Sequence, residues 1–247
     1  MIELIGDTII SGGRLSDDQF LKLYAEADIH QLGFLANRAR KRRHPEKIVT
    51  YVVDRNINYT DICISACKFC AFYQLPESGE GYLLSQEELK KKIEETLALG
   101  GTQILLQGGL HPDLQLDYYE DLVSFVKECG INVHGFSPPE IHHFSTISGL
   151  TVAEVIDRLV AAGLDSIPGG GAEILSDRVR KLVAPQKCTA AEWLEVMETA
   201  HGKGLRTTAT MMFGHIETVE ERLEHLSKLR ALQDRTGGFT AFIPWPF

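Results

Sequence analysis

Three of the five cysteines in this 247-residue chain lie within one eight-residue segment, at Cys63, Cys67 and Cys70. Thiolates are soft ligands, which suit an iron–sulfur cluster or zinc. A spacing of three residues and then two lets one loop reach three corners of a 4Fe–4S cubane. Because an electron-transfer cubane usually has four cysteines, three would leave one iron open, as catalytic metal sites keep a free position. The alternatives are a zinc site completed by a distant histidine and a set of unligated core cysteines.

The remaining cysteines, Cys129 and Cys188, lie in or beside expected helices, and we predict that they are ordinary packed thiols. Cys188 as a fourth ligand would close the open iron. An odd number of cysteines with three of them clustered suits a metal in a reducing compartment better than disulfides. The N-terminus lacks the basic and apolar regions of a signal peptide, and no segment approaches the roughly 20 apolar residues of a membrane span. We therefore expect a cytoplasmic protein without a membrane partner.

Other segments that could do chemistry follow short apolar runs. The two glycines of Gln107-Gly108-Gly109 allow a ligand to approach the backbone closely, although a tight turn would also use them. In Ser137-Pro138-Pro139-Glu140 the prolines stiffen the turn and remove two backbone donors. Glu140 could then reach the ribose hydroxyls or the amino group of a nucleoside; a surface carboxylate is the alternative.

Two later segments hold candidate acid–base groups. Residues 169–173 (GGGAE) offer free N–H groups that could cradle an anion, and Glu173 could touch a cofactor or substrate. The spacing is not GxGxxG, so it is a weak dinucleotide signal. His215 is a candidate acid, base or hydrogen-bond donor, against a structural role. His134 is either a satisfied core histidine or a pocket histidine.

The elements that must position these residues alternate regularly. Short apolar runs suit buried parallel strands, and the expected strands are Tyr51–Ile57, Gln103–Gln107, Asn132–Phe136, Asp165–Ile167, Thr207–Met211 and Phe239–Ile243. Capping boxes begin the helices between them, at Ser85 with Glu88, Thr151 with Glu154, Thr189 with Glu192, Thr218 with Glu221 and, loosely, Asp117 with Glu120. Glycines then mark helix ends, at Gly100, Gly130, Gly163 and Gly237.

This alternation predicts an α/β protein made of right-handed βαβ units, either a (β/α) barrel or an open doubly wound sheet. Only about six strands are expected, so a TIM-barrel-like fold would be partial or truncated, because eight strands close a barrel. Residues 1–48 are expected to form a small N-terminal helical segment, and residues 49–247 the barrel core.

The overall charge argues against one class of partner. The formal net charge is −9 and the isoelectric point is about 5.5, whereas a general nucleic-acid binder needs a basic face. One basic run, Arg38–His44, follows an amphipathic segment. We interpret it as a solvated helix face rather than a local anion site.

Several segments together resemble one family. The run DRNINYT (54–60) leads into CISACKFCAFY (63–73), followed by QGGLHPD (107–113), FSPPEIHH (136–143), DSIPGGGAEIL (165–175) and TTATMMFGH (207–215). From about residue 15 to the end, the chain resembles cyclic dehypoxanthinyl futalosine synthases. These are radical S-adenosylmethionine (SAM) enzymes of the futalosine route to menaquinone, and they continue past the segment GGFTAFIPWPF (237–247).

The resemblance implies a mechanism. A 4Fe–4S cluster on Cys63, Cys67 and Cys70 would bind SAM through its open iron and, once reduced, yield a 5′-deoxyadenosyl radical. That radical would take hydrogen from C4′ of dehypoxanthine futalosine, whose radical would close onto its own benzoate ring. Glu173 and His215 are candidates for the base that accepts the final proton. The implied SAM-binding residues are Phe69, Gln107, Gly108, Gly109, Ser137 and Glu140.

Alternatives remain open. Aminofutalosine synthase and the deazaflavin-forming enzymes share much of this pattern, and a non-catalytic zinc or redox-sensing module would also use clustered cysteines. The expected partners of the cyclase are its small-molecule substrate and a reduced electron donor such as flavodoxin or ferredoxin.

Overall fold

The computed structural model describes residues 2–247. Its contacts divide the chain into two units, which we call the helical unit and the sheet unit. The helical unit comprises the chain up to Tyr51 together with Thr218–Glu224, and the sheet unit comprises Val52–Glu217 together with His225–Phe247. We describe each unit by itself.

The helical unit contains α1 (Ile2–Ser11), α2 (Asp17–Glu26) and α3 (Ile29–Arg43). Ser16 begins α2 and Asp28 begins α3, each through a reciprocal capping box with a glutamine three residues later. A small apolar cluster joins the three helices, centred on Ile5, Leu23 and Leu35. The charged side chains of the basic run are exposed at the end of α3, as expected for a solvated helix face.

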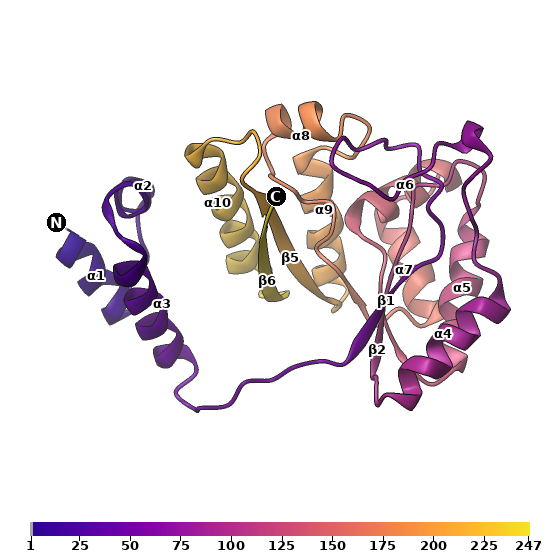
Figure 1. Cartoon of the computed structure of the whole chain (residues 1–247), viewed down its shortest axis with the longest axis horizontal. Helices are drawn as coiled ribbons and strands as arrows, with labels where there is room; N and C mark the ends of the chain where they lie inside the picture. Colours follow the sequence, from indigo (N-terminus) through magenta and orange to yellow (C-terminus); the bar gives the residue numbers. More distant parts are fainter. Residues whose placement is uncertain (1) are drawn as a thin grey trace. The chain divides into compact units, whose positions relative to one another are not determined.

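The sheet unit is built on six parallel strands that pair in chain order. A doubly wound sheet reverses its strand order at a switch point, so this order selects the barrel alternative. The fold is a half-barrel of α/β type, as predicted (Figure 1). Its strands are β1 (Asp54–Asn58), β2 (Gln103–Gln107), β3 (Asn132–Gly135), β4 (Ser166–Ile167), β5 (Arg206–Phe213) and β6 (Phe239–Pro246).

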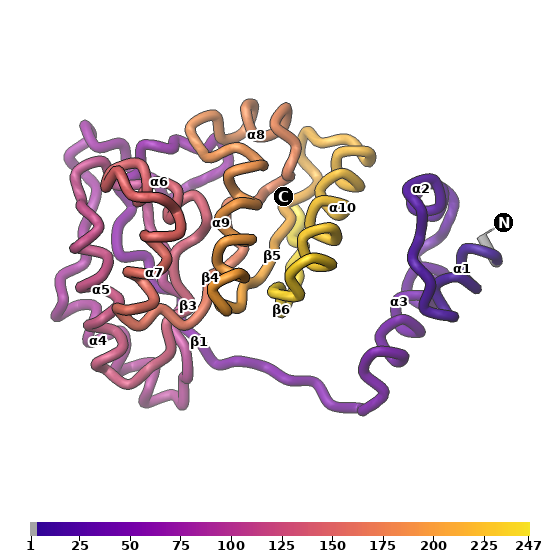
Figure 2. Tube along the Cα trace, turned by 180° about the vertical axis from the view of Figure 1, so that it is seen from behind, coloured from indigo at the N-terminus to yellow at the C-terminus, as the bar shows by residue number. Residues whose placement is uncertain are grey.

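Helices follow the strands and cover one face of the sheet, as Figure 2 shows from behind. The capping boxes predicted at Ser85, Thr151, Thr189 and Thr218 are present. The helices are α4 (Gln86–Ala98), α5 (Leu116–Glu128), α6 (Pro138–Ser148), α7 (Val152–Ala162), α8 (Asp177–Val183), α9 (Ala190–Gly202) and α10 (Val219–Thr236), with a short 3₁₀ turn, η1 (Pro76–Ser78).

The main hydrophobic core lies between the sheet and these helices. Tyr119 of α5 stacks on Phe144 of α6, with ring centroids 3.8 Å apart, and Phe136 packs edge-on against both. Trp193 of α9 is fully buried. This core occupies the covered face of the sheet, and the polar segments lie elsewhere, after the carboxyl ends of the strands.

Two local predictions were wrong, and the ends of β3, β4, β5 and β6 differ from the predicted bounds by one to three residues. Asp117 does not cap α5: the helix begins after Gln115, and Asp117 lies inside it as an acceptor for Arg158. The first strand begins at Asp54 rather than Tyr51. Pairing with β2 begins at Asp54, and Tyr51 and Val52, which are 88% and 54% exposed, stay outside the sheet.

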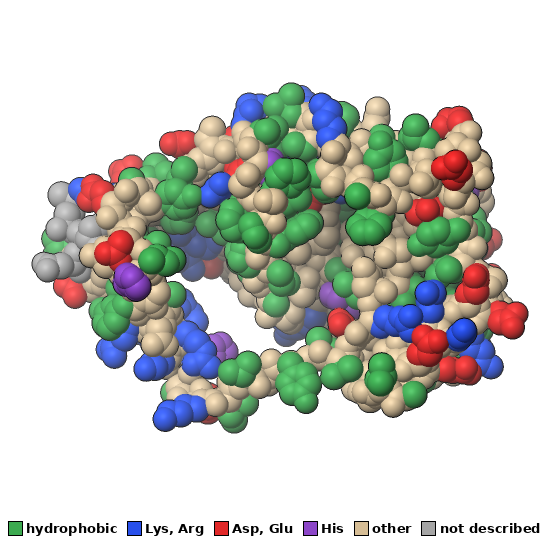
Figure 3. Space-filling model, viewed as in Figure 1, with side chains coloured by type: hydrophobic (Ala, Val, Ile, Leu, Met, Phe, Trp, Pro, Cys, Tyr) green, Lys and Arg blue, Asp and Glu red, His purple; other side chains and the backbone are tan. Residues whose placement is uncertain are grey.

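The outer surface of α4 carries mixed charges, which Figure 3 shows as neighbouring blue and red side chains. Lys90 pairs with Glu94 along the helix, and Arg55 of β1 pairs with Glu95. No helix among the described residues is long and apolar enough to cross a membrane.

Candidate active site

The cysteine segment forms a loop that leaves the carboxyl end of β1 and is tied to its surroundings by backbone hydrogen bonds. The N–H of Cys63 donates to Gln74 O at 2.9 Å, and that of Ile64 donates to Leu110 O at 3.0 Å. The N–H of Lys68 donates to Val183 O, at the end of α8, at 2.8 Å. The loop is therefore held against both the β2 side and the α8 side of the sheet unit.

Hydrogen-bond donors already point at the thiols. Cys63 Sγ accepts from the N–H groups of Ser65 at 3.4 Å and Leu110 at 3.2 Å. The hydroxyl of Ser65 lies 3.3 Å from Cys67 Sγ. Burial raises the pKa of Cys63, against the lowering effect of its two backbone donors. Hydrogen bonds to sulfur of this kind surround the thiolates of iron–sulfur clusters and tune their potentials.

Cys63, Cys67 and Cys70 line a single cavity of about 330 Å³, which we call the cluster cavity. Across the described residues, no three His, Cys, Asp or Glu side chains converge closely enough to hold one metal ion. A mononuclear zinc ion needs its ligands at one point. A cubane takes its thiolates at separate corners, so three cysteines around one cavity fit it better.

Glycines bring the second wall of the cluster cavity close to the loop. A Cβ placed on Gly109 would lie 2.1 Å from Ile62 O and 2.9 Å from Cys63 Cβ, so only glycine lets the end of β2 pack there. The cavity also meets every residue that the sequence named for SAM binding: Phe69, Gln107, Gly108, Gly109, Ser137 and Glu140.

The carboxylate of Glu140 is buried and bonded within the protein, whereas the sequence predicted a group that is free to reach a nucleoside or lies on the surface. Its carboxylate is 2% exposed as a residue and accepts four hydrogen bonds: from Tyr59 Oη and Gly108 N, both at 2.9 Å, and from Ser137 N and Oγ at 2.7 and 2.6 Å. Burial raises the pKa of Glu140 to about 7, although all four donors lower it. Its oxygens are therefore engaged by the protein, and what they hold in place is the ends of β1, β2 and β3.

Glu173 lines neither the cluster cavity nor the cavity around His215 that is described below. Its carboxylate is buried and lies 2.6 Å from Lys187 Nζ. Burial raises the pKa of Glu173, but the charges of Lys187 and Arg180 outweigh it, so the net pKa is lowered. A carboxylate paired in this way is a weak proton acceptor, and its role as a base stays a prediction.

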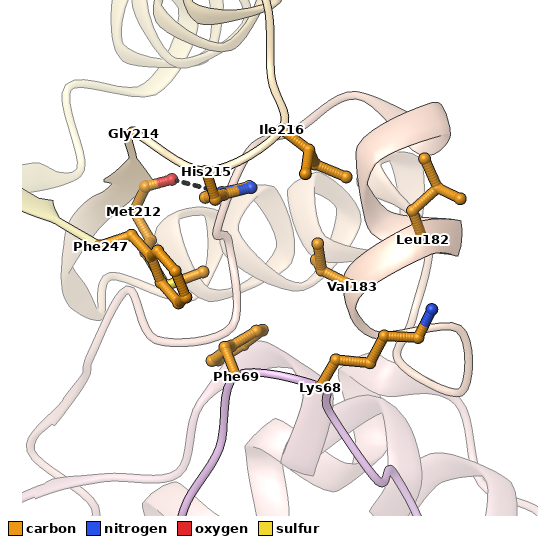
Figure 4. A pocket seen from close by; sticks show the side chains of 9 residues that line it. All are labelled: Lys68, Phe69, Leu182, Val183, Met212, Gly214, His215, Ile216 and Phe247. Atoms are coloured by element: carbon orange, nitrogen blue, oxygen red, sulfur yellow. Dashed lines mark hydrogen bonds between the residues drawn. The ribbon is translucent and has the colours of Figure 1, made fainter.

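His215 lines a second cavity of about 540 Å³, beside the cluster loop (Figure 4). Its Nε2 lies 3.0 Å from Met212 O, and its Nδ1 lies 3.5 Å from a carboxylate oxygen of Glu217. The other lining side chains are mostly apolar, and the rings of Phe247 and Phe69 are drawn one above the other in Figure 4. Phe69 borders both cavities, so His215 sits where an apolar ligand next to the cluster cavity would reach it.

Other candidates lie away from these cavities. His134 hydrogen-bonds to Ser166 Oγ at 2.7 Å, and burial lowers its pKa, as in a satisfied core histidine. Cys188 is buried, and the guanidinium of Arg180 contacts its Sγ at 3.6 Å, away from the cluster cavity. Cys129 caps the end of α5. The residues that the sequence did not single out are Tyr59, Arg180 and Lys187.

Comparison with known families identifies the class of enzyme to which the half-barrel and its three-cysteine cavity belong. The model of the radical SAM superfamily matches residues 57–229, more than half of the chain. The chain belongs to this superfamily, whose members use a 4Fe–4S cluster and SAM.

Within the superfamily, the chain is 45% identical over its whole length to the cyclic dehypoxanthine futalosine synthases of Streptomyces coelicolor and Halalkalibacterium halodurans. It covers 63% and 67% of those two proteins, and between about half and two thirds of the other curated relatives compared with it. It is also 49% identical, over 81% of its length, to a 5-amino-6-(D-ribitylamino)uracil–L-tyrosine 4-hydroxyphenyl transferase of Archaeoglobus fulgidus, of which it covers 57%.

Solved structures support the fold. Methylornithine synthase aligns with a TM-score of 0.75 at 17% identity, over 98% of this chain and 67% of that one. The FeFe-hydrogenase maturase HydG of Carboxydothermus hydrogenoformans aligns with a TM-score of 0.74 at 21% identity, over 98% of this chain and 56% of that one. These likenesses concern the fold alone.

Proposed function

We propose that this chain is the core of a radical SAM enzyme that cyclises dehypoxanthine futalosine in the futalosine route to menaquinone. Cys63, Cys67 and Cys70 are its proposed cluster ligands. The observation that carries the proposal is that these three thiols line one cavity together with the glycine-rich end of β2. The similarity to cyclic dehypoxanthine futalosine synthases over the whole chain supports the choice of substrate.

The chain's own residues would hold and orient the reactants. Gly108 and Gly109 let the end of β2 pack closely against Tyr59 and the cluster loop, and both line the cluster cavity, where the methionine end of SAM would lie against their backbone. Phe69 offers an apolar surface between the two cavities. Glu140 acts by fixing Gly108 and Ser137 rather than by contacting the nucleoside, because its oxygens accept four protein donors. Such positioning supplies much of the catalytic advantage in reactions of this kind.

Bound together, the reduced cluster and SAM would supply the carbon radical that starts the reaction. The protein must then place the substrate against that radical and accept one proton at the end. His215 is the better placed of the two proposed bases, since it lines the apolar cavity while Glu173 is paired with Lys187. Three further points stay predictions. They are a flavodoxin or ferredoxin as electron donor, the cytoplasmic location, and the division into residues 1–48 and 49–247.

The test of the cluster is anaerobic reconstitution of the protein with iron and sulfide. We expect about four irons per chain for a single cubane, its spectrum on reduction, and conversion of SAM to 5′-deoxyadenosine. Cys67→Ala should lose both the cluster and turnover, whereas Cys129→Ser, outside the cavity, should keep both. Retained turnover in Cys67→Ala, or zinc without iron in the reconstituted protein, would remove the proposal.

A second function is favoured by an observation of its own. The chain is 44% identical over 98% of its length to the aminodeoxyfutalosine synthase of Thermus thermophilus, and its identity to the ribitylaminouracil transferases is as high as to the cyclases. Identity alone does not choose among these. Supplying each purified substrate in separate anaerobic reactions does: the cyclase proposal expects product from dehypoxanthine futalosine, and product only from another substrate would replace it.

A further inference from the structure

A buried ion pair, Glu173–Lys187, lies beside the cluster cavity, and the function proposed above gives Lys187 no role. Lys187 Nζ and Glu173 Oε1 are 2.6 Å apart, and the side chains are 17% and 3% exposed. Taking two charges out of water costs energy that their attraction repays only with good geometry. A buried pair retained at this cost indicates that its charges act on a neighbouring group, and the group beside it is the cluster loop.

The backbone around the pair is held in place by one further side chain. Arg180 of α8 is buried, and its guanidinium donates to the carbonyls of Gly171 and Ala172, directly before Glu173, at 2.9 and 2.8 Å. The same guanidinium donates to Cys188 O, directly after Lys187, at 2.9 Å. One arginine thus ties together the two loops that carry the pair, which fixes where the charges lie.

The Lys187 ammonium is aimed at the cluster loop. Lys187 lines the cluster cavity with the three cysteines, and its Nζ lies 5.3 Å from the centre of the Phe69 ring. Burial lowers the pKa of Lys187, but the charge of Glu173 outweighs it, so the net pKa is raised. The ammonium is therefore a positive charge held at the wall of the cavity that the three cysteines line, in a site of low dielectric, where charges act strongly.

We propose that the Glu173–Lys187 pair sets the reduction potential of the cubane, with the Lys187 ammonium stabilising the reduced cluster and Glu173 limiting that effect. The inference rests on the proposed function, because it needs the cubane. Reduction brings one electron from an external reductant and makes the cluster one unit more negative. A cation beside the thiolates favours that state, and net charge is one of the properties that set such potentials.

The experiment is a redox titration of the anaerobically reconstituted protein with dithionite, followed by the spectrum of the reduced cluster. SAM is left out, so that a contact between Lys187 and SAM does not enter. Lys187→Met removes the cation and leaves Glu173 unpaired, and we expect a lower potential. A tenfold fall in the equilibrium constant for one-electron reduction would be a shift of about 59 mV. Glu173→Gln leaves the cation unpaired, and we expect a higher potential.

The double variant Lys187→Met/Glu173→Gln removes both charges, so its potential should lie between those of the two single variants and below that of the wild type, because the cation is the charge that lines the cavity. Lys187→Arg keeps the cation and should stay close to the wild-type potential. If Lys187→Met does not fold, Glu173→Gln and the double variant still carry the test. Lys203→Met is the matched control, because Lys203 pairs with exposed Asp157 and lines neither cavity. It should leave the potential unchanged.

Opposite shifts in the two single variants support the inference, since mere distortion of the loop has no reason to change sign with charge. An intact cubane whose potential moves the same way in both variants, or in neither, overturns it. Failure of the wild-type protein to assemble a cubane overturns the proposed function instead. Iron and sulfide content, measured in every sample, separates these two results.

Discussion

At the scale of single residues, the carboxylate of Glu140 joins three strand ends. Tyr59 directly follows β1, Gly108 directly follows β2, and Ser137 begins α6 after β3; all three donate to it. The sequence placed Glu140 correctly at this edge of the sheet. What it did not indicate is that Tyr59 and Gly108, which lie far from Glu140 along the chain, consume the acceptors that a nucleoside would need.

The raised pKa of Glu140 predicts a pH-dependent stability. The pKa of Glu140 is about 7 in the folded protein, against an ordinary value of 4.5. The contribution of its protonation to stability is therefore fully present below about pH 4.5 and is lost as the pH rises through 7. The free energy of unfolding of the wild type should therefore fall relative to Glu140→Gln across that interval, by up to about 3 kcal/mol. Urea unfolding at a series of pH values measures the difference.

Glu154 provides the control for this titration. It closes a capping box in the same way but is exposed, and hydrogen bonds from Thr151 lower its pKa. Its contribution is present above its ordinary pKa and lost as pH falls, so Glu154→Gln should differ from the wild type in the opposite direction and at lower pH. A pH-independent difference between the wild type and Glu140→Gln would contradict the assignment.

Gly109 offers a second residue-scale prediction. Gly109→Ala places a methyl group against the Ile62 carbonyl and the Cys63 side chain, so the cluster loop must move. We expect most of the iron to be lost after reconstitution while the far-ultraviolet circular dichroism is unchanged. Gly202→Ala is the control, because nothing lies within 4 Å of its new Cβ. Full iron content in Gly109→Ala would show that the close approach is not needed.

The three cysteines could be found from the sequence because their spacing is local, within one loop. Lys187 and Arg180 could not. Lys187 is one cation in a polar segment between two helices, and only the fold places it beside the cluster cavity and against Glu173. Arg180 lies in the short helix α8, where its three carbonyl partners belong to loops on either side.

At the scale of elements, the sequence predicts best where periodicity and packing agree. β2 was predicted to the residue, because Ile104 and Leu106 are both buried by neighbouring strands and helices. β1 was predicted three residues too early, since Tyr51–Val53 is apolar but exposed. Hydrophobicity alone does not say whether a neighbouring strand is present to pair with, so strand boundaries at a sheet edge are the hardest to predict.

Arg180 joins the loops on either side of α8, so its replacement should destabilise both loops. Arg180→Met leaves the carbonyls of Gly171, Ala172 and Cys188 without this donor. Hydrogen bonds to a charged group contribute about 1.5–3 kcal/mol each and are not additive, so we expect destabilisation of about 3 kcal/mol. Arg180→Lys should recover little of it, because an ammonium lacks the planar fork that reaches three acceptors. Chemical denaturation measures both variants.

A surface arginine calibrates this effect. Arg235 pairs with Glu198 where both side chains are about half exposed, and Arg235→Lys should hardly change the free energy of unfolding, because solvent screens exposed ion pairs. If Arg180→Lys were as stable as the wild type, the joining of the two loops would have to come from other contacts.

At the scale of the whole molecule, the proposed cluster and the hydrophobic core occupy different parts of the sheet unit. The core lies between the sheet and the helices, and includes Tyr119, Phe144 and Trp193. Cys67 packs instead in a small separate cluster with Ile174 and Val179. The sheet should consequently fold without the cubane, while the cysteine loop should depend on it.

Removal of iron tests this separation. A ligand that binds only the folded state stabilises it, so chelation should lower the unfolding temperature of the reconstituted protein. Hydrogen exchange should quicken in the loop, for example at Ile64 and Lys68, whose amides bond to neighbouring segments, and stay slow at Ile104 and Leu106 in β2. Cys67→Ala should not respond to the chelator, and Cys129→Ser should respond like the wild type. Rapid exchange throughout the sheet after chelation would mean that the cubane stabilises the whole sheet unit.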